Sequence, residues 1–86
     1  MNVWIAVYVS WDGNSTLGVF SEKPLAQRCI DKYAAKKNRD YSRMEKVAPK
    51  DDYKFDRWEK QADGKWRRGG DMESLEIYQD KIRDKA

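Results

Sequence analysis

The start of the chain alternates in a way that predicts a β-strand with two apolar faces. One face is aliphatic and the other mainly aromatic, because successive side chains of a strand point to opposite sides. The aliphatic face consists of Val3, Ile5, Val7 and Val9. The other face consists of Trp4, Ala6 and Tyr8. Turn-forming residues follow over 11–16, and the pattern of 17–20 predicts a short second strand that completes a β-hairpin.

Residues 22–37 follow a helical period. Ser21 is a favourable N-cap, and Pro24 is tolerated in the first turn because amides there need no intrahelical acceptor. Apolar residues recur at spacings of three and four: Leu25, Ala26, Cys29, Ile30, Tyr33 and Ala34. Asn38 is a stop signal, so we expect the helix to end near Lys37.

We expect this helix to cover the aliphatic face of the first strand. The aromatic face, with Trp4 and Tyr8, then needs a cover of its own. Two covers remain open: the C-terminal segment 71–83, or another protein, including a second copy of the chain. In the latter case Trp4 and Tyr8 form a second interface.

The second half of the chain is more polar. A weak alternation predicts a strand over 41–47, followed by a loop over 49–52. Residues 54–61 and 65–68 form a second hairpin around the turn at 62–64. Asp71 is a cap for a last helix, whose apolar spacing comprises Met72, Leu75, Tyr78 and Ile82. The alternative is a strand with Leu75, Ile77 and Gln79 on one face, which fits the spacing less well. The predicted fold is therefore α+β: a small antiparallel sheet of two hairpins, one helix packed across it and a C-terminal helix, in one domain spanning residues 1–86.

Composition excludes several kinds of chemistry. The 86 residues contain no His and one Cys, so a Ser–His or Cys–His pair, a structural zinc site and an internal disulfide are all ruled out. Cys29 lies in the apolar stripe and is expected to be a small core residue. No apolar run is long enough to span a membrane, and the start lacks the basic leader of an export signal. We therefore expect a cytoplasmic, non-enzymatic protein without cofactor or metal.

Charge is uneven along the chain although the formal net charge is only +3. Residues 22–39 hold six basic and two acidic groups, and residues 53–69 hold six and three. The second segment also interleaves cations with aromatic rings, a pattern that suits single-stranded nucleic acid or an acidic protein surface. It is also the pattern of a solvated hairpin in which Trp58 and Trp66 pack across the strands, in the core or on the surface. The candidate partner-binding residues are Arg57, Trp58, Lys60, Lys65, Trp66, Arg67 and Arg68.

The step Gly18-Val19-Phe20-Ser21, followed by a helix with Ala26 and Ile30 on its buried side, resembles a group of small phage and prophage proteins of unknown function. The later hairpin from Trp58 to Trp66 is similar to their closing strands. The resemblance implies a phage gene expressed in a bacterial cytoplasm. It suggests a binding protein that inhibits a host factor by occlusion, such as an anti-CRISPR or other anti-defence protein.

Two partner classes follow from these patterns. The first is a host protein, including one within a nucleic-acid-binding complex. The alternative is direct binding of nucleic acid through the basic aromatic hairpin at 53–69. Either mode suits a monomer or a homodimer, and neither involves a membrane.

Overall fold

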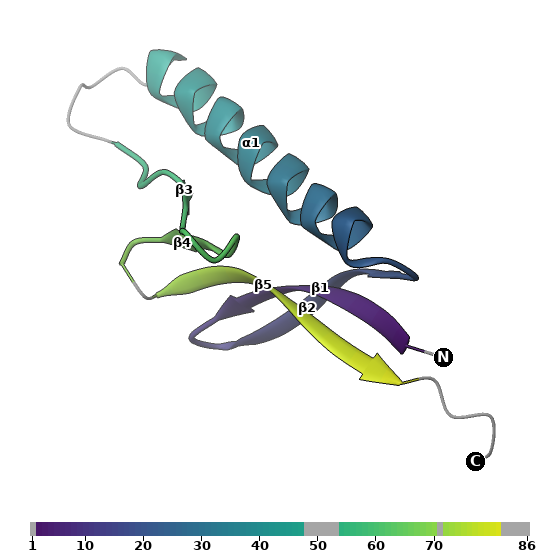
Figure 1. The fold of residues 1–86 in the computed structure, drawn as a ribbon. Helices are drawn as coiled ribbons and strands as arrows, with labels where there is room; N and C mark the ends of the chain where they lie inside the picture. The colour runs from purple at the N-terminus through teal and green to yellow at the C-terminus, as the bar shows by residue number, and fades with distance from the viewer. Residues whose placement is uncertain (1, 48–53, 71, 82–86) are drawn as a thin grey trace.

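A computed structural model describes residues 2–47, 54–70 and 72–81 of this chain. Within them, one helix lies on one face of a five-stranded antiparallel sheet (Figure 1). The spatial order of the strands is β2-β1-β5-β4-β3. The elements are β1 (Asn2–Ser10), β2 (Gly13–Phe20), α1 (Lys23–Val47), β3 (Glu59–Lys60), β4 (Trp66–Arg68) and β5 (Glu73–Lys81). The α+β class is confirmed, but the sheet is continuous and is not a pair of hairpins.

The first hairpin is tighter than expected. Pairing runs to Ser10 and Gly13, so the turn comprises Trp11 and Asp12 and the expected loop over 11–16 is wrong. Gly13 has a φ of +144°, which residues with a side chain rarely adopt. The Ser10 hydroxyl hydrogen-bonds within this turn, at 3.0 Å from the Gly13 carbonyl oxygen. These local bonds let the chain reverse in two residues.

The helix is longer than expected, because Asn38 does not end it. It runs to Val47, so the strand expected over 41–47 is wrong. The segment from 38 to 47 contains neither Gly nor Pro, and Tyr41 continues the buried side of the helix against the core. At the other end the Glu22 carbonyl accepts from the amides of Leu25 and Ala26, and the helix begins at Lys23 rather than directly after Ser21.

The expected C-terminal helix is also wrong. Residues 73–81 form β5, which pairs with β1 along nine positions and with β4 on its other edge. Leu75 and Ile77 contact the core under α1, as the period of two requires. Met72 and Tyr78, which the helical spacing placed on a buried face, are exposed. Asp71 and Ile82 lie outside the described residues.

The helix covers the face of the sheet opposite to the one expected. Ala6, on the face with Trp4 and Tyr8, is fully buried beneath α1. On the helix Ala26, Ile30 and Ala34 are also fully buried. Small side chains on both surfaces let the helix approach the sheet closely while larger rings fill the sides of the contact. The aliphatic face of β1 is therefore turned away from the helix.

Residues 54–58 have no regular secondary structure and bring Trp58 into the core. This side chain is only 4% exposed. Its ring meets those of Tyr8 and Tyr33 edge-on, with centroids 6.1 Å and 6.2 Å apart. Trp58 therefore joins the sheet, the helix and the segment before β3.

Candidate functional site

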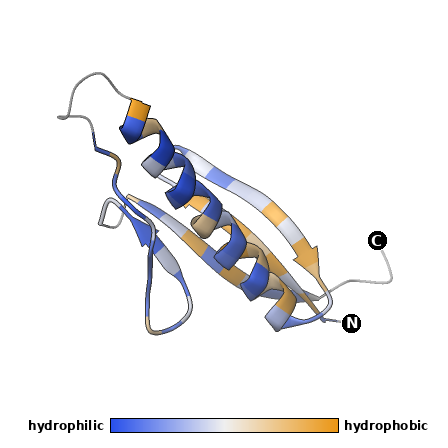
Figure 2. Cartoon of the chain, turned by 90° about the horizontal axis from the view of Figure 1, so that it is seen from above, coloured by the Kyte–Doolittle hydropathy of each residue, from blue (hydrophilic) through white to orange (hydrophobic). Residues whose placement is uncertain are grey.

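A row of cations runs along the solvent side of α1. Its members are exposed and follow each other at spacings of three or four residues, which places them on one face of the helix. They are Arg28, Lys32, Lys36, Arg39, Arg43 and Lys46, hereafter the basic row. The row is about 27 Å long at the rise of an α-helix. Seen from above, this side of α1 is largely hydrophilic (Figure 2).

The acids of the helix do not neutralise the basic row. Asp31 and Glu45 lie on a flank of α1 that faces residues 54–66, and both bind groups of that segment. The third acid, Asp40, lies between the basic row and the buried side according to the helical spacing. Within the described part of the chain, no salt bridge involves a residue of the basic row.

The flank that carries these two acids forms a polar row of its own. Its members recur at spacings of four and seven residues, so they share one side of the helix. They are Gln27, Asp31, Asn38 and Glu45, hereafter the polar flank. Each of them hydrogen-bonds a group of the segment 55–66, which fixes that segment beside the helix.

Asp31 holds the β3–β4 hairpin. Its Oδ1 accepts from the indole Nε1 of Trp66 at 2.8 Å, and its Oδ2 lies 3.4 Å from the Nζ of Lys60. Gln27 donates to Asp31 and to the carbonyl oxygen of Gly64 in the turn. Although burial raises the pKa of Asp31, the hydrogen bonds from Trp66, Gln27 and Lys60 outweigh it and lower the pKa below its usual value.

Glu45 holds the segment before β3. It accepts two hydrogen bonds from the Arg57 guanidinium, at 3.0 Å and 2.7 Å, and one from the Phe55 amide at 2.6 Å. The Arg57 hydrogen bonds, followed by that of Phe55, lower the pKa of Glu45. Next to this pair the rings of Phe55 and Tyr41 stack at 4.9 Å. A bidentate Arg–carboxylate pair fixes orientation as well as position.

Asn38 binds both backbone groups of Trp58. The Trp58 amide donates to Asn38 Oδ1 at 2.8 Å, and Asn38 Nδ2 donates to the Trp58 carbonyl at 3.1 Å. A side-chain amide thus takes the place of a neighbouring strand for this residue. Asn38, which suggested a helix end, instead lies within the helix and binds the segment beside it.

The cations predicted to form a docking surface on the hairpin are mostly paired with acids of the same chain. Arg57 pairs with Glu45 and Arg68 with Glu73. Lys60 lies 3.4 Å from Asp31, and Lys65 lies 3.7 Å from Glu76. Arg67 is exposed but is engaged in an interaction of its own. The charge of the hairpin is thus largely balanced, whereas that of the basic row is not.

The aromatic part of the predicted docking surface faces inward. Trp58 is buried in the core, which removes it from any docking surface. Trp66 packs against the core, and its indole N–H donates a hydrogen bond to Asp31. Neither ring is thus placed as a platform for stacking bases.

Trp4 and Tyr8, the second predicted interface, lie on the face that α1 covers. Lys23 sits over the Trp4 ring at 5.7 Å, and Tyr8 packs against Tyr33 and Trp58. The Tyr8 hydroxyl donates to Glu73, which also accepts from Arg68. Burial, reinforced by Glu73, raises the pKa of Tyr8 to about 12. The cover of this face is the long helix, because residues 73–81 form β5 within the sheet.

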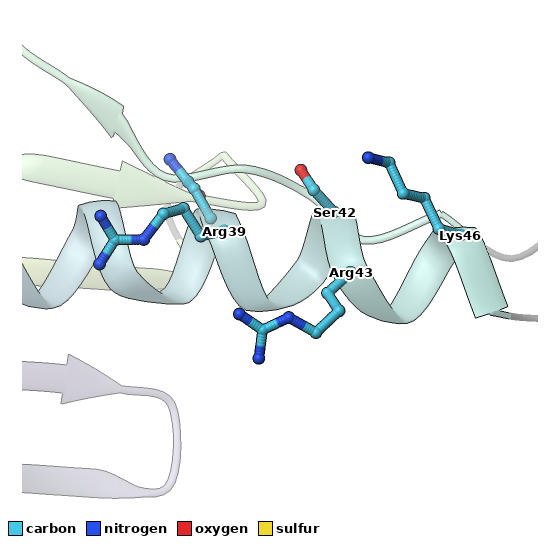
Figure 3. A pocket seen from close by; sticks show the side chains of 5 residues that line it. Arg39, Ser42, Arg43 and Lys46 are labelled. Carbon is cyan, nitrogen blue, oxygen red and sulfur yellow. The ribbon is translucent and has the colours of Figure 1, made fainter.

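A shallow hollow lies at the C-terminal end of the basic row. It is lined by Asn38, Arg39, Ser42, Arg43 and Lys46. Figure 3 shows the three cationic side chains extending from one stretch of α1 around Ser42. On its inner side Ser42 accepts from Arg57 at 3.3 Å. Guanidinium and ammonium groups around an open hollow can donate hydrogen bonds to anions.

The sequence prediction missed half of the basic row. Arg39, Arg43 and Lys46 fall beyond the expected helix end, and the last two were placed on a strand. The signal was present, because the spacing of cations by three and four continues through residue 46 without interruption. A strand would have put Arg43 and Lys46 on opposite faces.

Three further features of the described residues bear on site chemistry. They contain no group of three or more His, Cys, Asp or Glu side chains placed to hold a metal ion. Cys29 is half-buried, and burial raises the pKa of its thiol. The helix found there is not apolar enough to cross a membrane.

No protein-family model matches the chain, and neither the curated proteins nor the solved structures contain a match.

The first prediction concerns the bond between Asn38 and Trp58. Asn38→Ala leaves the amide of a buried residue without its acceptor, so we expect it to lower the free energy of unfolding by about 1–3 kcal/mol. Asn38→Asp keeps the acceptor and loses only the donor, so its loss is smaller. Thermal unfolding followed by circular dichroism measures both. Lys36→Ala, at an exposed position of α1 without a hydrogen-bond partner in the described chain, is the control; equal losses in all three variants would contradict the assignment.

We expect the anchoring of the segment 54–66 by Asp31 and Glu45 to weaken at low pH. The pKa values of Asp31 and Glu45 are lowered in the folded state, so their contribution to stability is complete above their unfolded values, about pH 4. It is lost as the pH falls through the lowered values. We expect the near-ultraviolet signal of Trp58 and Trp66 to change before the helical signal during acid titration.

The matched variants for this titration are Asp31→Asn and Glu45→Gln. Each should weaken the early acid transition, because the group that takes up the proton is gone. Asp12→Asn, in the β1–β2 turn, should leave it in place. Simultaneous loss of both signals in the unaltered protein would show that the segment 54–66 does not separate from the helix.

Proposed function

We propose that the protein is a non-enzymatic nucleic-acid-binding protein that contacts the phosphate backbone of a duplex through the basic row of α1. The observation that carries the proposal is the line of exposed cations without a salt bridge to the rest of the described chain. Cations that neutralise phosphates release counterions, and this release supplies most of the affinity in binding without sequence preference.

A duplex fits this surface better than a single strand. Proteins that bind single strands combine cations with aromatic side chains on which the bases stack. The basic row contains no aromatic residue, and the rings of the hairpin pack inward. The row is straight and about 27 Å long, which suits regularly spaced phosphates. Recognition would then be of charge and shape, with little reading of bases.

The hypothesis of a host-factor inhibitor draws less support from this geometry. Protein interfaces usually depend on a few buried aromatic or Arg anchors. The anchors suggested for the hairpin were Trp58 and Trp66, and both are engaged internally. An inhibitor of the anti-CRISPR kind remains compatible with the basic row if the occluded surface is acidic or is the nucleic acid itself.

The third prediction compares two equal changes of charge. Arg39→Glu alters the middle of the basic row, and Lys65→Glu alters the β3–β4 hairpin. Fluorescence anisotropy with a labelled DNA duplex measures the affinity at several salt concentrations. We expect Arg39→Glu to weaken binding about tenfold and to reduce the salt slope by roughly one. Lys65→Glu should have a much smaller effect, because Lys65 already has an acidic neighbour.

The outcomes separate the candidate functions. A stronger effect of Lys65→Glu than of Arg39→Glu would show that the nucleic-acid-binding site lies on the β3–β4 hairpin and not on α1. Tighter binding to a single strand than to the duplex would contradict the backbone mode. Absence of any binding at low salt would exclude nucleic acid and leave an acidic protein surface as the partner of the row. With all six cations engaged, the slope of log K against log salt for the unaltered protein approaches about −5.

A further inference from the structure

The face of the sheet that points away from α1 is apolar along its centre. Alternation along β1 places Val3, Ile5, Val7 and Val9 there, and of these Val7 is already buried in the single chain, at 7% exposed. Val19 lies opposite Ile5 on β2, and Tyr78 lies opposite Ile5 on β5. Val19 is 58% exposed and Tyr78 47% exposed. Figure 1 shows no element of the described chain beneath this face.

The polar groups beside this apolar centre satisfy one another. Ser74 donates to Glu76 at 2.7 Å, and Tyr78 donates to the same carboxylate at 3.2 Å. Lys65 adds an ion pair at 3.7 Å. The Ser74 hydrogen bond is the largest cause that lowers the pKa of Glu76. A carboxylate with three partners costs less to cover than a bare one, since burial of an unpaired charge is strongly unfavourable.

The size of the face suits a small dimer. Strands β1, β2 and β5 have eight or nine residues each, which gives a surface about 30 Å long and three strands wide. A standard interface removes about 800 Å² per partner, and weaker contacts remove less.

Charge decides which occupant fits. The outer side of α1 is strongly basic, so two copies repel each other there. The sheet face has an aliphatic centre, and the register places Asp80, Arg67 and Glu59 on it beside the Glu76–Lys65 pair. Three acids and two bases leave it little net charge toward a second copy of itself. A two-fold contact brings the same surface together twice, which requires a self-complementary patch of this kind.

We propose that two copies of this chain pack face to face through the open side of the sheet. The contact consists of Val3, Ile5 and Val9 of β1 together with Val19 and Tyr78. Two sheets packed in this way lie about 10 Å apart, with both helices on the outside. The contact does not involve the basic row, so it holds whether or not the protein binds nucleic acid.

The test is the mass of the full chain in solution. Light scattering after size exclusion and sedimentation equilibrium, over a dilution series, should give twice the monomer mass of 10.2 kDa. Val19→Glu places a new charge in the interface, and each dimer carries it twice. We expect its dissociation constant to rise by roughly 100-fold or more. Tyr78→Ser removes an apolar contact and should weaken the dimer to a lesser degree.

The matched control is Val47→Glu, the same substitution at an exposed position on α1. It should leave the dimer unchanged. Circular dichroism confirms that each variant keeps its fold, which the exposure of Val19 in the monomer favours. A monomer at all concentrations overturns the proposal. A dimer that neither Val19→Glu nor Tyr78→Ser weakens also overturns it, because the contact then lies elsewhere, such as the free edge of β2.

Discussion

The position of Trp58 organises the rest of this small protein. Its ring fills the space between α1 and the sheet, while its backbone is bound by Asn38 of the helix. The residues before and after it are thereby carried to the flank of α1, where Glu45 and Asp31 bind them. A chain of this length buries a limited core, so one large side chain held at both its ring and its backbone has a large share in defining the fold.

Three sides of α1 have different roles. One side packs on the sheet with small residues, the polar flank binds the segment 55–66, and the remaining side carries the basic row. Two of the three acids of the helix are used on the flank, so they do not neutralise the cations. The charge of the exposed side is therefore a consequence of how the second half of the chain is anchored.

Local pattern was a good guide to β1, to the start of α1 and to the turn at 62–64, where Gly64 has a φ of +91°. It failed where the structure depends on contacts between residues that are far apart in the sequence. Asn38 resembles a stop signal until its partner Trp58 is known, and Leu75 and Ile77 become strand residues because the edge of β1 offers nine pairing positions. Both faces of β1 are apolar, so the sequence could not tell which one the helix covers. The clustering of cations was visible, but their alignment on one surface required the full length of α1.

The side chains of the basic row can change during evolution more freely than the length of α1. Residues of the basic row make no salt bridge within the described chain, so substitutions there leave folding largely untouched. Insertion of a single residue in the middle of α1 disturbs folding, because it rotates all later side chains of the helix by about 100°. Asn38 and Glu45 would then turn away from the segment they hold. Relatives of this protein should accordingly vary in the number of their cations and preserve the length of the helix.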